Sequence, residues 1–87
     1  MKQFGVKMTF GQMLKSLRTE KYLTQKDFAS LLGLQTSTLR NWERDINLPN
    51  TAHIRFLLEF LPTKGFNKDT LKEMSELWKE SAHHGHE

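Results

Sequence analysis

Two short helices that follow each other closely are the feature that most constrains this chain. The first is predicted to begin after Thr24, a capping residue, and to end at Gly33, because glycine adopts the left-handed conformation of a helix end without steric cost. The second is predicted over 36–44. Ala29 is small where the two helices cross, since a larger side chain would force them apart. The apolar residues that join the pair are Phe28, Leu32, Leu34, Leu39 and Trp42.

Three further helices are predicted from caps and apolar spacing. Thr9 and Gln12 form a capping box that opens the first. Asn50 caps a helix that precedes a breaking segment at 62–65, and Asn67 caps the last helix. Apolar residues recur at helical spacing in all three, at Phe10, Met13, Leu14 and Leu17, at Ile54, Leu57, Leu58 and Leu61, and at Leu71, Met74, Leu77 and Trp78. We therefore expect an all-α fold, a compact five-helix domain.

Length and composition favour one small intracellular domain. The 87 residues leave room for a single domain. Cysteine is absent, which excludes disulfides and thiolate metal sites and suits a reducing cytoplasm. No segment is apolar enough to cross a membrane, and the N-terminus lacks the apolar stretch of a secretory signal. We expect a cytoplasmic protein.

No arrangement of residues suggests an enzyme. The predicted fold places no nucleophile beside a base and no carboxylate pair in a cleft. His83, His84 and His86 resemble a metal-binding tract, but they supply fewer ligands than a closed zinc site takes. His53, beside a core helix, fits a structural or surface role. We expect no catalytic residue, no cofactor and no metal.

Positive charge is concentrated in the first half of the chain. The net charge is +3 and the isoelectric point is near 9.4. Residues 1–50 carry eight basic and four acidic residues, whereas residues 51–87 carry five basic and six acidic ones. This excess favours an anionic partner such as nucleic acid, although a basic, merely soluble surface would carry the same charge.

The run from Leu23-Thr24-Gln25 to Trp42-Glu43-Arg44, together with Pro49, resembles the Cro/repressor helix-turn-helix family of bacteria and their phages. The resemblance covers about residues 9–61 and implies a lambda-repressor-like domain that binds operator DNA as a two-fold dimer. It also implies that the helix at 36–44 enters the major groove, with half-sites about 34 Å apart. Within the family, residues 38–43 look most like the antitoxin branch.

The resemblance assigns roles to both helices of the motif. The residues that would contact base edges, through hydroxyl, amide and guanidinium groups, are Gln35, Thr36, Ser37, Arg40 and Asn41. Those that would contact phosphate are Thr24, Gln25, Lys26 and Arg44. Arg18 and Glu43 would form a structural ion pair between the first and third helices. The alternative for the polar residues is a plain solvated helix face, while Trp42 fits core packing better than base stacking.

Two residues depart from the family pattern. Asp45 stands where the family usually has glycine, so we expect a left-handed or bridge conformation there, which aspartate tolerates better than most residues. Gln35 stands where Ser or Thr usually caps the recognition helix. We expect that Gln35 caps this helix more weakly, or that its side chain is available to contact DNA.

Apolar residues outside the core stripes suggest dimerisation. Phe56 and Phe60 lie off the stripe of their helix, and with Leu77 and Trp78 they are predicted to form a homodimer interface. The alternative is that the last helix folds back and covers the phenylalanines within one chain. The expected organisation is an N-terminal arm at 1–8, a helix-turn-helix core at 9–61, a C-terminal helix at 62–82 proposed for dimerisation, and a disordered tail at 83–87.

These patterns predict a sequence-specific double-stranded DNA-binding regulator that represses its own operon as a homodimer on a palindromic site. The alternative is an antitoxin-type protein that mainly binds a partner protein such as a toxin, with DNA autoregulation secondary. A third reading is a scaffold that keeps the fold without reading DNA. The terminal segments 1–8 and 81–87 are short for a toxin-binding arm, and the polar, non-acidic reader residues argue against a scaffold.

Overall fold

The structure, a computed structural model, describes residues 8–84, with the backbone alone for residues 83 and 84. Five α-helices and one short 3-10 turn make up this part of the chain, and it contains no strand. In chain order they are α1 (Phe10–Glu20), α2 (Gln25–Leu32), α3 (Thr36–Glu43), α4 (Thr51–Phe60), the 3-10 turn η1 (Leu61–Lys64) and α5 (Lys68–His84). The predicted all-α, five-helix fold is confirmed.

The helices begin where their capping residues predict. The capping box of α1 is complete: the Thr9 hydroxyl accepts from the backbone of Gln12, and the Gln12 side chain accepts from the backbone of Thr9. The side chains of Thr24, Asn50 and Asn67 cap α2, α4 and α5 in the same way. Each cap satisfies one of the backbone N–H groups that a helix start leaves without a partner.

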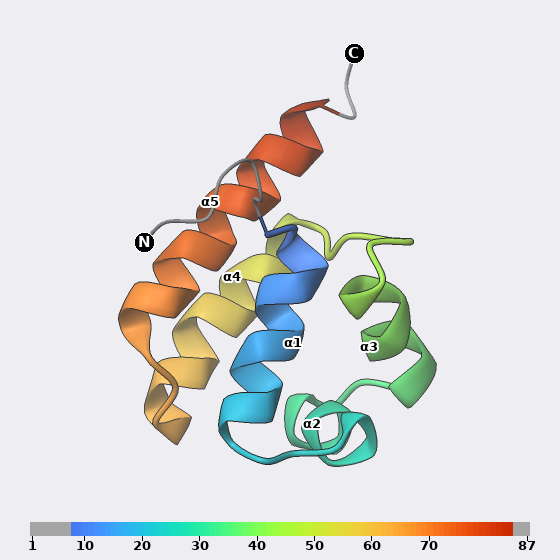
Figure 1. The fold of residues 1–87 in the computed structure, drawn as a ribbon, viewed down its shortest axis with the longest axis vertical. Helices are drawn as coiled ribbons and strands as arrows, with labels where there is room; N and C mark the ends of the chain where they lie inside the picture. Colours follow the sequence, from blue (N-terminus) through green and yellow to red (C-terminus); the bar gives the residue numbers. More distant parts are fainter. Residues whose placement is uncertain (1–7, 85–87) are drawn as a thin grey trace, which may run out of the picture.

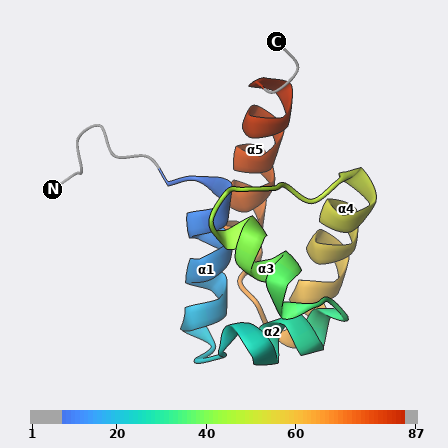
Figure 2. The same ribbon diagram turned by 90° about the vertical axis from the view of Figure 1, so that its right-hand side faces the viewer.

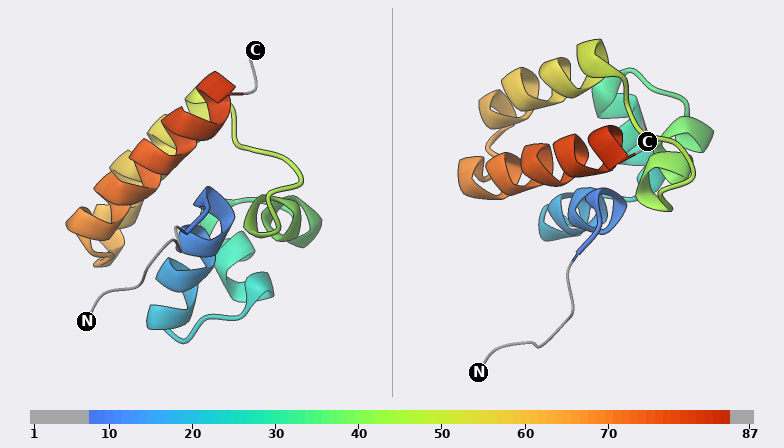
Figure 3. Two further views of the ribbon diagram at one scale, coloured as in Figure 1. Left: turned by 45° about the horizontal axis from the view of Figure 1, so that its top comes forward. Right: turned by 90° about the horizontal axis from the view of Figure 1, so that it is seen from above.

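The core lies where α1 packs between α3 and α5. The views in Figures 1 and 3 place α3 toward one side of α1 and α5 toward the other, with α4 alongside α5. The residues with the most completely buried side chains come from every α-helix: Phe10, Leu14, Leu17, Phe28, Leu39, Leu57 and Met74, with Leu61 from η1. This shared core fixes α2 and α3 against α1, and it therefore sets the orientation of the helix pair.

The last helix folds back onto the domain. α5 packs against α1 and α4, and Trp78 donates a hydrogen bond from its indole Nε1 to the carbonyl of Pro49 at 2.7 Å. The helix continues through His84, so the first two residues of the segment 83–87, expected to be a disordered tail, are helical. The rest of that tail, and most of the predicted arm at 1–8, lie outside the described residues.

The start of α1 lies in close contact with the residues at the end of α3. Asp45 has a φ of 59°, the left-handed conformation expected for it. Its carboxylate accepts from the Thr9 hydroxyl at 2.6 Å and from the backbone N–H of Gly11 at 2.9 Å. A Cβ on Gly11 would lie 2.4 Å from the carbonyl oxygen of Glu43, so only glycine fits between the two backbones. We call this contact of Asp45, Thr9 and Gly11 the α1–α3 clasp.

Candidate nucleic-acid interface

One face of α3 is polar and open to solvent. Ser37 and Arg40 are exposed, and Thr36 and Asn41 are partly exposed. The opposite face carries Leu39 and Trp42, which are buried, so the expectation that Trp42 belongs to the core is correct. Figure 2 shows α3 crossing α2 with α5 behind them. The polar face of α3 is therefore a surface on which hydroxyl, amide and guanidinium groups are accessible together.

Gln35 precedes this face without capping it. The residue is the N-cap of α3 by position, but its side chain makes no capping hydrogen bond, unlike Thr24 at the start of α2. Gln35 is exposed. Its amide, with donors and an acceptor, remains accessible at the start of the polar face of α3.

A buried ion pair fixes the other end of α3. The guanidinium of Arg18 binds both carboxylate oxygens of Glu43, with its Nε at 2.7 Å and its Nη2 at 3.0 Å. The Glu43 side chain is only 2% exposed. The third guanidinium nitrogen of Arg18 donates to the carbonyl of Leu23 at 2.9 Å, in the turn between α1 and α2. Arg18 thereby links α1 to the end of α3 and to the turn that precedes α2, and its bidentate contact with Glu43 is geometrically specific.

Gln25 joins the start of α2 to the same carboxylate. Its Nε2 donates to Oε1 of Glu43 at 3.0 Å, so the start of α2 lies beside the end of α3. Spacing within either helix did not signal this contact, because Gln25 and Glu43 belong to different elements. Thr24 and Lys26 are exposed at the same end of α2, and Arg44 is exposed next to Glu43. The contact of Gln25 with Glu43 thus places the start of α2, where three of the residues expected to contact phosphate lie, beside the end of α3, where the fourth follows Glu43.

Comparison with known proteins places this sequence in a family. The sequence matches the helix-turn-helix family over residues 14–65. The chain belongs to the Cro/C1-type helix-turn-helix family. No curated protein and no solved structure gives a significant match. The family membership makes the chain a DNA-binding transcription regulator, and no helix in residues 8–84 combines the length and hydropathy that a membrane span requires.

In this helix-turn-helix protein, the four residues expected at a dimer interface lie in two different environments. Phe56 of α4 is 41% exposed, and its ring stacks on that of Phe60 with centroids 5.0 Å apart. Phe60, Leu77 and Trp78 are all partly buried against the core of their own chain. Of these four residues, Phe56 therefore offers the most accessible apolar side chain.

The histidines of the regulator form no metal site among the described residues. His53 is exposed, lies edge-on to Trp42 at 5.5 Å, and has its Nδ1 3.1 Å from the amide oxygen of Asn50. No group of three metal-binding side chains lies together where side chains are described. The tract formed by His83, His84 and His86 falls outside that part.

Proposed function

We propose that this protein is a sequence-specific regulator of transcription that represses its own operon by binding double-stranded DNA with α3 in the major groove. The observation that carries this proposal is the polar face of α3, held rigidly by the buried pair of Arg18 and Glu43 at its far end. A reading helix must be accessible and fixed in orientation, since specificity depends on hydrogen bonds of defined geometry. On this proposal the protein acts in the cytoplasm, where it associates with the chromosome.

Base recognition is proposed for five residues on or beside this face: Gln35, Thr36, Ser37, Arg40 and Asn41. The Arg40 guanidinium suits the paired acceptors of guanine, and the Asn41 amide suits the donor and acceptor of adenine. Thr36 and Ser37 lie in the first turn of α3, where hydroxyl groups reach base edges when the helix enters the groove by its N-terminal end. The amide of Gln35 is accessible for the same purpose because it is not used as a cap.

Phosphate contacts are proposed at the edge where α2 begins and α3 ends. Lys26 and Arg44 supply positive charge there, and Thr24 and Gln25 supply neutral donors. The amide nitrogen of Gln25 has two hydrogens, and its bond to Glu43 uses one of them, so the second is available to a phosphate oxygen. Such contacts position the protein on DNA and make binding depend on salt, without reading sequence.

A two-fold homodimer on a palindromic site is the proposed binding form. The exposed ring of Phe56, which stacks on the partly buried ring of Phe60, supports it, because aromatic side chains are enriched at protein interfaces. Leu77 and Trp78 belong to the same proposal in a minor role, because both are partly buried in their own chain and Trp78 is hydrogen-bonded to Pro49 there. In a dimer the two copies of α3 would enter successive major grooves, about 34 Å apart along the duplex.

The proposed function is tested by binding to the DNA upstream of the protein's own gene. Fluorescence anisotropy at several salt concentrations compares that duplex with a random duplex of equal length. We expect a preference of about 10³-fold or more for the upstream DNA, with occupancy of two half-sites. Equal, strongly salt-dependent binding to both duplexes would mean that the protein binds DNA only through electrostatic contacts with phosphate. That result would contradict sequence-specific autoregulation.

A further inference from the structure

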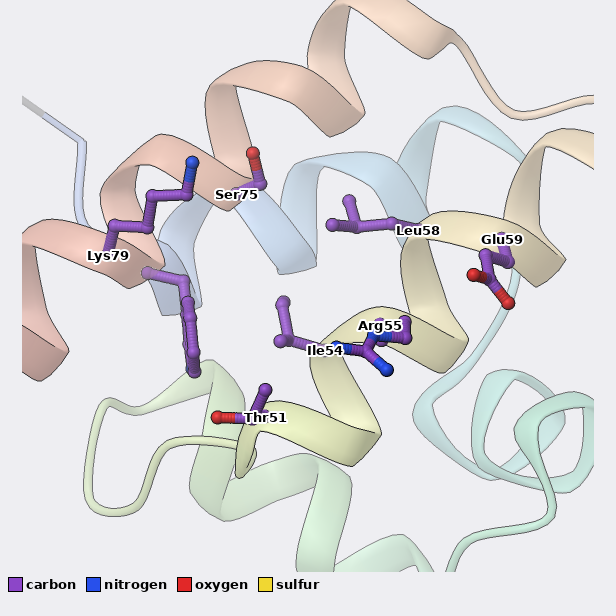
Figure 4. Close-up of a pocket in the computed structure, with 8 residues that line it drawn as sticks. Thr51, Ile54, Arg55, Leu58, Glu59, Ser75 and Lys79 are labelled. Atoms are coloured by element: carbon purple, nitrogen blue, oxygen red, sulfur yellow. The ribbon is translucent and has the colours of Figure 1, made fainter.

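A groove runs between α4 and α5, on helices that do not include the reading helix. Two adjoining hollows form it, with volumes of about 300 Å³ and 430 Å³, and both are lined by Leu58 and Ser75. Figure 4 shows the first of these hollows, with Ile54 and Leu58 of α4 on one side and Ser75 and Lys79 of α5 on the other. The floor is largely apolar, with Ile54, Leu58, Pro62, Leu71 and Trp78 contributing. The domain therefore leaves an apolar channel uncovered between two packed helices.

The rim of this groove is predominantly cationic. Lys68, Lys72 and Lys79 line it from α5, and Arg55 lines it from α4. All four are exposed, and Glu59 is the one acidic residue among those that line the two hollows. Lys68, Lys72, Ser75 and Lys79 follow each other at steps of four, three and four residues, which places them on one side of α5. An apolar floor below a basic rim is complementary to a ligand that is both apolar and acidic.

We infer that this groove binds an acidic, amphipathic segment of another protein. Apolar side chains of the segment would fill the floor, and its carboxylates would pair with the lysines and Arg55 at the rim. Along α5, Lys68 and Lys79 are separated by about 16 Å at 1.5 Å per residue, so a helix of about 11 residues spans the cationic row. This is the recognition mode in which an amphipathic helix lies in a groove.

The charge pattern argues against the other occupants. The N-terminal segment 1–7 of the same chain contains Lys2 and Lys7 and no acidic residue, so the basic rim would repel it. Two copies meeting groove to groove would oppose their lysine rows. The exposed acidic residues Asp69, Glu73 and Glu76 of α5 have beside them only Leu77, which is partly buried against its own core, and one such side chain leaves most of the floor of another copy's groove unfilled. Nucleic acid phosphates would pair with the rim but likewise leave the apolar floor in water.

The test uses the full chain and a displayed library of random peptides of about 15 residues, long enough to span the groove as a helix. Selected peptides are titrated against the wild type, against K72E/K79E, and against K15E/K64E. Both variants replace two exposed lysines, so their net charges are equal, but Lys15 and Lys64 lie outside the groove lining. Tryptophan emission gives a second readout, because Trp78 lines the groove.

We expect selection to enrich acidic peptides with apolar residues at helical spacing. Their binding should weaken at least about tenfold in K72E/K79E, where like charges would face each other, and remain within about twofold in K15E/K64E. Replacing the peptide's acidic residues by lysine should restore binding to K72E/K79E. The inference is overturned if selection yields no acidic amphipathic peptide or if both variants weaken binding equally. It is also overturned if K72E/K79E instead abolishes binding to random duplex DNA, to anionic vesicles, or to a second copy in sedimentation.

Discussion

At the scale of single residues, Arg40 and Asn41 are the side chains on which sequence preference should depend. Replacing either by alanine removes a proposed bidentate base contact, and we expect each change to cost about 1–3 kcal/mol of operator affinity. Binding to random duplex should change much less for Asn41→Ala, since that residue carries no charge. Lys26→Ala is the control, because loss of a phosphate contact should weaken both duplexes equally. Fluorescence anisotropy on the two duplexes measures both effects, and equal losses for Asn41→Ala would show that this face does not read bases.

Glu43 is the residue whose loss should most affect stability. Glu43→Ala would leave the buried guanidinium of Arg18 with only the Leu23 carbonyl, and we expect a loss of about 3–5 kcal/mol in the free energy of unfolding. The double variant R18M/E43L should lose less, because no unpaired charge stays buried. Urea denaturation followed by circular dichroism measures both. A double variant less stable than Glu43→Ala would contradict this account of the pair.

At the scale of elements, the crossing of α1 and α3 depends on the absence of a side chain at Gly11. In a typical helix interior, alanine in place of glycine stabilises by about 1 kcal/mol. Here the new Cβ would lie 2.4 Å and 2.6 Å from the carbonyl oxygens of Glu43 and Trp42, so Gly11→Ala should lower the melting temperature instead. Lys15→Ala, at an exposed position of α1, should leave it nearly unchanged. A melting temperature raised by Gly11→Ala would mean that the two helices separate without cost.

The clasp at Asp45 makes a second prediction at this scale. Asp45→Gly relieves a left-handed backbone at a gain of about 1 kcal/mol, but it removes two hydrogen bonds to a carboxylate, each contributing about 1.5–3 kcal/mol. The lost bonds outweigh the relief, so Asp45→Gly should be destabilising. Asp45→Ala should be worse, because it loses the bonds and keeps the strain. Thermal unfolding of the three proteins should rank them in this order, and an Asp45→Gly variant as stable as the wild type would show that the carboxylate contributes nothing.

Helix starts and the apolar stripes were predictable from the sequence because both are local. Thr9, Thr24, Asn50 and Asn67 each cap a backbone group three residues away, a relation visible in any linear sequence. The clasp was not predictable in the same way, since Asp45 reaches a helix start 34 residues earlier in the chain. Its backbone conformation followed from the residue type, whereas its partners followed only from the packing of α1 on α3.

In the candidate site, too, local features were predictable from the sequence and contacts between elements were not. The polar face of α3 follows from helical spacing, and the residues of the edge between α2 and α3 followed from the family resemblance. Gln25 and Arg18 both donate to the carboxylate of Glu43. This shared contact depends on how α1, α2 and α3 pack together, and helical spacing within one element does not predict it. The groove between α4 and α5 was likewise missed, because apolar stripes show which faces are buried but not how completely two helices cover each other.

At the scale of the whole molecule, self-association should depend on the exposed ring of Phe56. We expect the wild type to sediment as a dimer on its operator, and Phe56→Asp to remain folded but sediment as a monomer, since a buried carboxylate without a partner opposes association. Tyr22→Asp, at a side chain that is 92% exposed in the turn after α1, is the control and should leave the dimer intact. Sedimentation velocity measures all three, and a wild type that is monomeric both free and on DNA would exclude the dimer.

The missing cap at Gln35 affects how such a regulator can diversify. At Thr24 a hydroxyl holds the start of α2, so most substitutions there carry a cost in stability. The side chain of Gln35 makes no capping hydrogen bond, so a substitution at this position should change the free energy of unfolding very little. If Gln35 reads DNA as proposed, this position lets descendants of the chain acquire new operators by single changes, with the scaffold tolerating every intermediate.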